Sequence, residues 1–235
     1  MLCLAVGEAL GRDPDELLPA ACSLELVHTF SLVHDDLPAL DDDDLRRGQP
    51  SAHVRFGEGV AILAGDALLT EAFRLALTYP TPDPARELAQ ATVGMIGGQY
   101  VDVTTDGGLD GEGLAQLHDL KTGRLLAACV TCATAVARMP PAEREPWAAF
   151  GKEVGLLFQI VDDILDATGT AAELGKTPGK DEAAGKVTYV SLHGLERARE
   201  LADEARARVN ECLEELPADT SVLAAIVAAI RERNA

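Results

Sequence analysis

A cluster of aspartates near residue 162 is the first group of residues that could do chemistry. Gln159, Asp162, Asp163 and Asp166 are spaced i, i+3, i+4 and i+7, which puts them on one stripe of a helix whose other residues are apolar. Carboxylates on a buried helix repel each other and resist ionisation unless cations compensate them. Mg²⁺ commonly uses a few carboxylates together with substrate phosphates, so the stripe predicts a magnesium site.

A second aspartate cluster lies earlier in the chain and repeats this logic. Asp35 and Asp36 close an apolar helical run, and Pro38 removes a backbone donor and is expected to end the helix. The turn that follows lets Asp41 come back toward Asp35, although six helical residues would put the two on opposite sides.

Arginines follow the second cluster directly. The run 41–44 is entirely aspartate, and Arg46 and Arg47 come two and three residues later. Carboxylates that bind metal beside arginines that bind oxyanions describe a clamp for a diphosphate. Each cluster also has a plainer reading: a solvent-facing acidic stripe near residue 162, and an acidic loop neutralised by its own arginines near residue 41.

The composition predicts the elements that must position these residues. The chain has 235 residues, of which 47% are apolar and only 4% aromatic, so the core must consist mainly of Leu, Ala, Val and Ile. Ala and Leu favour helices, and long stretches lack the alternation typical of strands. We predict an all-α fold with one domain over residues 1–235, its helices covering 2–10, 19–36, 58–79, 84–105, 112–137, 143–169, 187–215 and 218–233.

Charge and cysteine content narrow the partners and the compartment. The formal net charge of −19 argues against nucleic acid and against attachment to anionic membrane. The longest nearly apolar run, Leu125–Ala137, is shorter than the roughly 18 residues that a membrane span needs, so no membrane insertion is expected. Cys129 and Cys132 form the one C-x-x-C pair, which supports buried helix residues better than a zinc site. A cytoplasmic protein is expected.

At these motifs the sequence resembles the trans-isoprenyl diphosphate synthases, most closely bacterial farnesyl diphosphate synthase. The stretch 34–48 looks like the first aspartate-rich motif of that family, and 159–166 looks like the second. Further similar segments are Ala64–Leu68, Gly97–Asp102, Lys121–Gly123, Leu174–Asp181 and Gly185–Tyr189. The likeness therefore covers essentially the whole chain.

The resemblance implies a bundle of long helices around a central cavity, usually paired as a homodimer. It implies three Mg²⁺ ions between an allylic diphosphate and the two motifs. Direct ligands would be Asp35, Asp41 and Asp162, with Asp36, Asp163 and Asp166 as ligands or as supports of ligands. The allylic diphosphate would be held by Arg46, Lys121, Thr122, Gln159 and Lys176, and isopentenyl diphosphate by His28 and Arg47.

The implied reaction joins isopentenyl diphosphate head to tail with dimethylallyl or geranyl diphosphate. We expect mainly fifteen-carbon farnesyl diphosphate, because Phe30 lies five residues before Asp35 and its ring can act as a floor to the growing chain. Leu26, further down the same helix, could form a second floor and permit a twenty-carbon product. The alternatives are a geranylgeranyl diphosphate synthase and a non-catalytic partner subunit of such an enzyme.

One departure and two other classes bear on this prediction. The family places a Gly-Lys-x-x-Arg-Pro segment ahead of the helix that starts here at Met1, and we interpret its lack as an incomplete N-terminus. A terpene cyclase would carry Asn, Thr or Ser in its second metal motif, which is all acidic here. A di-iron bundle needs two Glu-x-x-His motifs, and Glu25–His28 is the one present.

Overall fold

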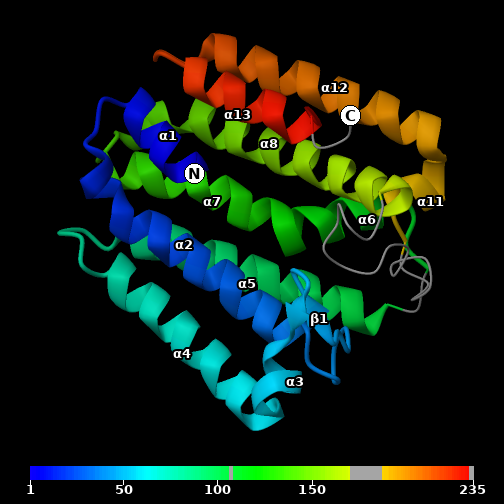
Figure 1. Ribbon diagram of the computed structural model, residues 1–235. Helices are drawn as coiled ribbons and strands as arrows, with labels where there is room; N and C mark the ends of the chain where they lie inside the picture. Colours follow the sequence, from blue (N-terminus) through cyan, green and yellow to red (C-terminus); the bar gives the residue numbers. More distant parts are fainter. Residues whose placement is uncertain (106–107, 170–186, 233–235) are drawn as a thin grey trace.

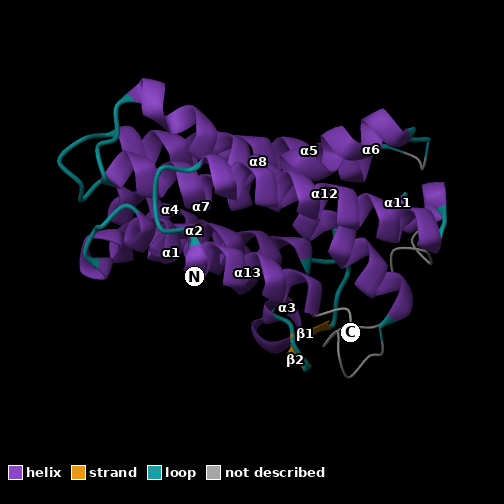
Figure 2. Cartoon of the chain, turned by 90° about the horizontal axis from the view of Figure 1, so that it is seen from above, coloured by secondary structure: helices purple, strands orange, loops and turns teal. Residues whose placement is uncertain are grey.

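Helices form most of the part of the chain that the structure describes, as the abundance of Ala and Leu predicts (Figures 1 and 2). The computed structural model describes residues 1–105, 108–169 and 187–232. In chain order the helices are α1 (Leu2–Ala9), α2 (Pro14–Asp35), α3 (Ala52–Phe56), α4 (Glu58–Ala76), α5 (Asp83–Thr104), α6 (Gly111–His118), the π-helix η1 (Asp119–Gly123), α7 (Arg124–Val136), α8 (Pro141–Thr168), α11 (Tyr189–His193), α12 (Leu195–Glu215) and α13 (Ser221–Glu232).

The long helices lie roughly side by side in a stack that places α7 and α8 at its centre (Figure 1). On one side α12 and α13 cover α8, and on the other α5 and α2 pack against α7, with α4 outside α2. Trp147 and Phe150 of α8 are fully buried, as is Val130 of α7. The core therefore lies where the helix that carries the second aspartate cluster meets its neighbours.

The start of α2 corrects one predicted boundary. The helix begins at Pro14 and not at residue 19, because the side chain of Asp13 accepts a hydrogen bond of 3.0 Å from the backbone N–H of Asp15. Proline at the first helical position loses no hydrogen bond, since that N–H has no partner inside a helix. Pro19, read from sequence as the end of a break, lies inside α2.

Two predicted helices are divided in the structure. The prediction of one helix over 187–215 is wrong, because Gly194 adopts a φ of +79° between α11 and α12. That left-handed conformation is one that glycine reaches without steric cost. The helix predicted over 112–137 contains the π-helical turn η1 between α6 and α7. The remaining predicted helices are confirmed to within a few residues.

A short hairpin and a short helix lie in the stretch after α2 that was predicted as a break. Strand β1 (Leu45–Arg46) pairs antiparallel with β2 (Gln49–Pro50), and α3 follows. The two turn residues, Arg47 and Gly48, have φ of 53° and 72°, as a type I′ turn requires. The hairpin lies at the end of the bundle where α6 and α11 also lie (Figure 1).

Among the described helices, α2 is long and apolar enough to cross a membrane by length and composition. By this criterion α2 comes closer to a membrane span than the Leu125–Ala137 run does. Here 33% of its most apolar stretch is buried, and it packs against α1, α4 and α7.

Candidate active site

A cavity of about 1020 Å³ lies among α2, α5, η1, α7 and α8 and brings most of the predicted site residues together. Those that line it are His28, Phe30, Asp35, Arg46, Arg47, Lys121, Thr122, Gln159 and Asp162. Four predicted residues that the structure describes, Asp36, Asp41, Asp163 and Asp166, do not line it. Lys176 lies outside the described residues, as do the segments Leu174–Asp181 and 185–186.

The chain after α2 folds back on the end of that helix. The backbone N–H of Asp41 donates to the carbonyl oxygen of Asp35 at 2.8 Å, and that of Asp43 donates to the carbonyl of Asp36 at 3.1 Å. Asp42 allows this reversal with a φ of 48°, which Asp tolerates better than most residues. The prediction that the turn returns Asp41 to the level of Asp35 is therefore confirmed.

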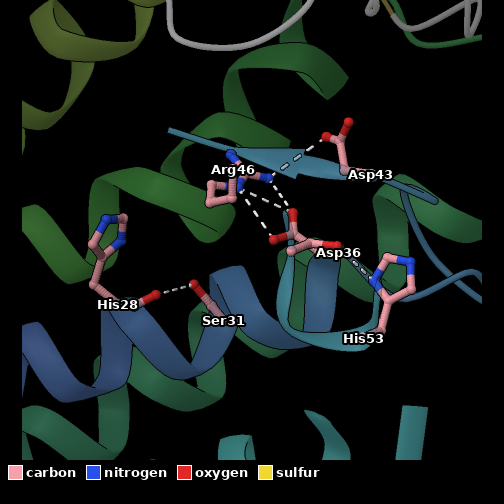
Figure 3. A network of polar contacts seen from close by, with 7 residues as sticks. His28, Ser31, Asp36, Asp43, Arg46 and His53 are labelled. Atoms are coloured by element: carbon pink, nitrogen blue, oxygen red, sulfur yellow. Dashed lines mark hydrogen bonds and ion pairs between the residues drawn. The ribbon is translucent and has the colours of Figure 1, made fainter. Parts of the chain in front are cut away.

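Arg46 is held beside this turn by two buried carboxylates (Figure 3). Its Nε donates to the two Asp36 oxygens at 3.0 and 3.3 Å, its Nη2 also donates to Asp36, and Asp43 lies 3.6 Å from Nη2. Burial opposes the charge of Arg46, but the hydrogen bond and charge of Asp36, with the charges of Asp35 and Asp41, outweigh it and raise the arginine pKa. The guanidinium is thus a fixed positive charge in the cavity wall.

Arg47 reaches the cavity from a strained backbone position. It is a non-glycine residue with positive φ in the hairpin turn, a conformation that costs about 1 kcal/mol or more for an L-residue. Such strain often accompanies functional sites, because surrounding structure must hold it. The hairpin therefore presents two adjacent arginines to one cavity.

His28 lines the cavity two helical turns before Asp35. Burial lowers the pKa of its imidazole, Glu25 opposes that shift, and the positive charges of Arg47 and Arg46 add to it. The backbone carbonyl of His28 accepts a hydrogen bond of 2.9 Å from the Ser31 hydroxyl (Figure 3). The ring is thus a neutral group at neutral pH.

On α8 the adjacent carboxylates of the second cluster differ in their surroundings. Asp162 lines the cavity, whereas Asp163 is only 5% exposed and does not. Asp163 Oδ1 accepts from Gln159 Nε2 at 2.9 Å, and its Oδ2 accepts from the backbone N–H of Tyr189 at 2.8 Å. Asp166 is also buried away from the cavity.

Lys121 enters the cavity from the π-helical turn η1. Its Nζ donates to Asp102 Oδ2 at 2.5 Å. The turn packs closely on α5 at Gly98, where a Cβ would lie 2.4 Å from the backbone nitrogen of Lys121. Glycine is required there, because any side chain would push the two helices apart.

The sequence prediction missed two polar residues of α5 that belong to this site. Asp102 forms the ion pair with Lys121, and Gln99 lines the cavity. The amide nitrogen and oxygen of Gln99 are both buried, and neither has a hydrogen-bond partner among the residues that the structure describes. Their signal in the sequence is the segment Gly97–Asp102, which was recognised as a family match without roles for its residues.

Phe30 faces the cavity, as the prediction about product length requires. It is 7% exposed, and its ring meets that of His34 edge to face at 5.2 Å. The cavity does not end there, because Leu24 and Ala21 of α2 also line it. The suggested second floor, Leu26, instead packs against the hydrophobic core.

The donor set fits Mg²⁺ that is held jointly with a bound diphosphate. Within residues 1–105, 108–169 and 187–232, no three His, Cys, Asp or Glu side chains form a group that could hold a metal by themselves. Asp35 and Asp162 nevertheless line one cavity from different helices, and Mg²⁺ is commonly bound by one or two carboxylates plus substrate phosphates. The two cysteines of the C-x-x-C pair lie in the packing of α7, where Cys132 is 2% exposed and burial raises the pKa of the Cys129 thiol to about 11.

Comparison with known proteins identifies the family. The family model described as Polyprenyl synthetase matches residues 1–230, and the chain belongs to that family. It is 46% identical to geranylgeranyl pyrophosphate synthase 7, chloroplastic, of Arabidopsis thaliana over 91% of this chain and 65% of that protein. The chain thus spans slightly less than two thirds of the length of that relative.

Two solved structures share the fold and a quarter or more of the sequence. Geranylgeranyl pyrophosphate synthetase from Pyrococcus horikoshii is 28% identical with a TM-score of 0.87, covering 99% of this chain and 84% of that one. Geranyltransferase from Helicobacter pylori, complexed with magnesium and isoprenyl diphosphate, is 30% identical with a TM-score of 0.79, covering 98% and 82%. Membership in this family argues against the terpene cyclase and di-iron alternatives.

Proposed function

We propose that this chain is a Mg²⁺-dependent prenyltransferase that condenses isopentenyl diphosphate with an allylic diphosphate. The observation that carries the proposal is the single cavity lined by Asp35 and Asp162 from two helices, by the cations Lys121, Arg46 and Arg47, and by apolar residues beyond them. Carboxylates for metal and fixed cations for oxyanions are what a diphosphate in such a site requires.

Each group in the cavity has a defined task in this proposal. Asp35 and Asp162, with Asp41 close to Asp35, would hold Mg²⁺, which when bound neutralises negative charge on the diphosphate. Lys121 and Arg46 would bind the allylic diphosphate and stabilise the charge that develops as it departs. Three ions per site, as in the expectation from sequence, are part of the proposal.

The reaction itself needs positioning more than proton transfer by the protein. The allylic C–O bond breaks, and its electron pair leaves with the diphosphate. The double-bond electrons of isopentenyl diphosphate, held through Arg47 and His28, form the new C–C bond and leave a cation at the tertiary carbon. A proton then leaves from the CH₂ group next to that cationic carbon, and its electron pair forms the new double bond. The released diphosphate can take this proton. Apolar walls exclude the water that would otherwise capture the cation.

We propose twenty-carbon geranylgeranyl diphosphate as the main product, in place of the farnesyl diphosphate expected from sequence. A fully extended chain gains roughly 1.2 Å per bond, so a fifteen-carbon prenyl chain spans roughly 14 Å and a twenty-carbon chain roughly 19 Å. Phe30 lies only about 8 Å below Asp35 along α2, whereas Ala21, still in the cavity wall, lies about 21 Å below it. The geranylgeranyl synthases among the similar proteins also support the longer product.

Pairing of two copies is a further part of the proposal. Val93, Ile96, Tyr100 and Val103 form an exposed apolar stripe along α5, and all but Val93 also line the rim of the cavity. Val60 and Leu63 add exposed apolar side chains on α4. Exposed apolar side chains grouped on neighbouring helices are typical of a protein interface, so a homodimer formed through α4 and α5 is expected.

Product chromatography tests the function directly. The protein is incubated with Mg²⁺, isopentenyl diphosphate and, in separate samples, dimethylallyl, geranyl or farnesyl diphosphate. Elongation of farnesyl diphosphate to a twenty-carbon product supports the proposal. Accumulation of fifteen-carbon farnesyl diphosphate would instead support the product expected from sequence. No turnover by this chain alone, but turnover with a second subunit, would identify a partner subunit.

A further inference from the structure

We propose that the two carboxylates of each adjacent aspartate pair have different tasks: the first faces the substrate cavity, and the second positions other site residues without binding metal. Asp35 and Asp162 are the first members, and Asp36 and Asp163 are the second. The assignment of metal to the first members rests on the proposed function, whereas the positioning role rests on contacts within the protein.

Asp36 is occupied by Arg46. It is 2% exposed, it does not line the cavity, and both of its oxygens accept hydrogen bonds from the guanidinium. Arg46 stands in β1, and Arg47 follows it in the turn of the hairpin. Asp36 therefore joins the end of α2 to the hairpin and fixes the direction from which both arginines reach the cavity (Figure 3).

Asp163 is occupied in the same way on α8. Its two oxygens accept from Gln159 Nε2 and from the backbone N–H of Tyr189, at 2.9 and 2.8 Å. Tyr189 is the first residue of α11, and its ring lies 5.4 Å from that of His118 in α6. Asp163 therefore joins the second aspartate motif to α11 and to the helix that leads into Lys121.

The hydrogen bond to Asp163 also determines which way the Gln159 amide points. An ionised carboxylate can only accept hydrogen bonds, so the amide nitrogen must be the atom that faces it. The amide oxygen of Gln159 is then turned to the other side. An Asn at position 163 preserves both contacts only if the Gln159 amide turns over, because the Tyr189 N–H takes the Asn oxygen and the Asn NH₂ group then needs the Gln159 oxygen as its acceptor.

Helix geometry explains why neighbours in sequence separate in this way. Successive residues on a helix point about 100° apart, so two adjacent carboxylates meet different neighbours, although adjacent residues such as Gln99 and Tyr100 can both line this cavity. The same division appears at the end of α2 and in the middle of α8, although the local structures differ.

Four matched Asp→Asn variants test the division, with inorganic pyrophosphate and Mg²⁺ as the probe. Calorimetry should show that Asp35→Asn and Asp162→Asn weaken Mg²⁺-dependent pyrophosphate binding at least tenfold, while Asp36→Asn and Asp163→Asn change the apparent Mg²⁺ affinity less than threefold. Loss of Mg²⁺ affinity in a second member equal to that in its neighbour would overturn the inference. A wild-type protein that does not respond to Mg²⁺ and pyrophosphate would instead count against the proposed function.

Double-mutant cycles test the positioning role in the free protein and in turnover. The urea midpoint of Asp163→Asn should fall less in a Gln159→Ala background than in wild type, and the same should hold for Asp36→Asn in an Arg46→Gln background. In turnover, Asp163→Asn should lower kcat about tenfold, while the Mg²⁺ concentration needed for half-maximal activity stays the same. In a Gln159→Ala background, adding Asp163→Asn should lower kcat no further. Additive effects in both cycles would contradict positioning, even if a variant is poorly active.

Discussion

The two aspartate motifs reach the same cavity from structures of opposite character. The first lies where α2 stops and the chain reverses through Asp42 and the Arg47–Gly48 turn, both with positive φ. Its order depends on ion pairs to Arg46. The second lies within the unbroken helix α8, which packs closely on η1, since a Cβ at Gly155 would lie 3.0 Å from the Cα of Gly123.

The carboxylates of the two motifs are therefore held in place in two different ways. Close packing of backbones fixes position rigidly and tolerates no added atoms, whereas a hairpin secured by ion pairs tolerates sequence change but stores strain. Substitutions that add volume should therefore have the larger effect where helices pack on η1. Substitutions that change charge or turn preference should have the larger effect at the end of α2 and in the hairpin. The predictions that follow test that contrast.

Removing the first carboxylate on either side should have the largest effect, and an equal one. Asp162→Asn and Asp35→Asn should each lower turnover about 10³-fold or more, because the departing diphosphate loses compensation of its charge. Incorporation of labelled isopentenyl diphosphate measures this. The controls are Asp15→Asn on α2 and Glu145→Gln on α8, both exposed, which should retain wild-type rates. Full activity in either Asp35→Asn or Asp162→Asn would contradict the proposal that both carboxylates belong to one metal and diphosphate site.

The next largest effect is expected on stability, when volume is added where α5 packs on η1. Gly98→Ala should destabilise the fold by about 3 kcal/mol, because the new Cβ meets the Lys121 backbone at 2.4 Å and neither helix can yield cheaply. Gly97→Ala is the matched control, since nothing lies within 4 Å of its Cβ position, and it should stabilise by roughly 0.5–1 kcal/mol. Urea unfolding distinguishes the two. Equal midpoints would show that α5 and η1 are not tightly packed.

On the hairpin side, Arg47→Asn should separate stability from binding. Asn-Gly favours the type I′ turn, so relief of backbone strain should raise the Tm by about 2–4 °C per kcal/mol gained. Loss of a charged hydrogen bond, about 1.5–3 kcal/mol, should raise the KM for isopentenyl diphosphate roughly ten- to 150-fold. Arg46→Gln is the contrast, because it breaks the contact with Asp36 and should lower the Tm. A fall in Tm for Arg47→Asn would contradict the strain argument.

The smallest expected effect is a pH dependence of stability that arises at His118, the residue directly before η1. Burial lowers the pKa of this imidazole from 6.5 to about 4; Asp102 opposes the shift, and Lys121 adds to it. Because the folded pKa is depressed, the unfolded chain binds the extra proton first, and stability is lost as the pH falls from about 6.5 toward 4. Unfolding free energy should drop by about 1–2 kcal/mol between pH 7 and 5.

His118→Phe is the control for that slope. It keeps a ring next to Tyr189 but cannot be protonated, so the part of the pH dependence that belongs to His118 should disappear. An unchanged slope in urea titrations at several pH values would place the titration elsewhere, for example at His28, whose pKa burial also lowers.

The sequence predicted the helices well where hydrophobic periodicity decides, and less well where a local cap does. Pro19 reads as a helix break, yet Asp13 caps a helix that begins one turn earlier. The strands of the hairpin have two residues each, too short for any alternating pattern to reveal. An extra residue inside a helix, as in η1, leaves no mark in composition at all.

The site was predictable in most of its members and only partly in their division of tasks. The family resemblance correctly brings Asp35 and Asp162 to one cavity, and it leaves Asp36 and Asp163 open between metal ligands and supports of ligands. What separates them is the position of Arg46, Gln159 and the α11 backbone, which depends on tertiary packing. The cavity beyond Phe30 likewise depends on how α2 and α7 are set apart, and no property of Phe30 itself specifies that.

The extra residue in the π-helical turn at 119–123 determines the direction in which Lys121 points. One surplus residue in a turn leaves α6 and α7 out of phase by about 100°, so that Leu114 and Leu117 stay buried while Lys121 points inward. Deleting a single residue would restore a regular helix and rotate either the leucines or the lysine out of place.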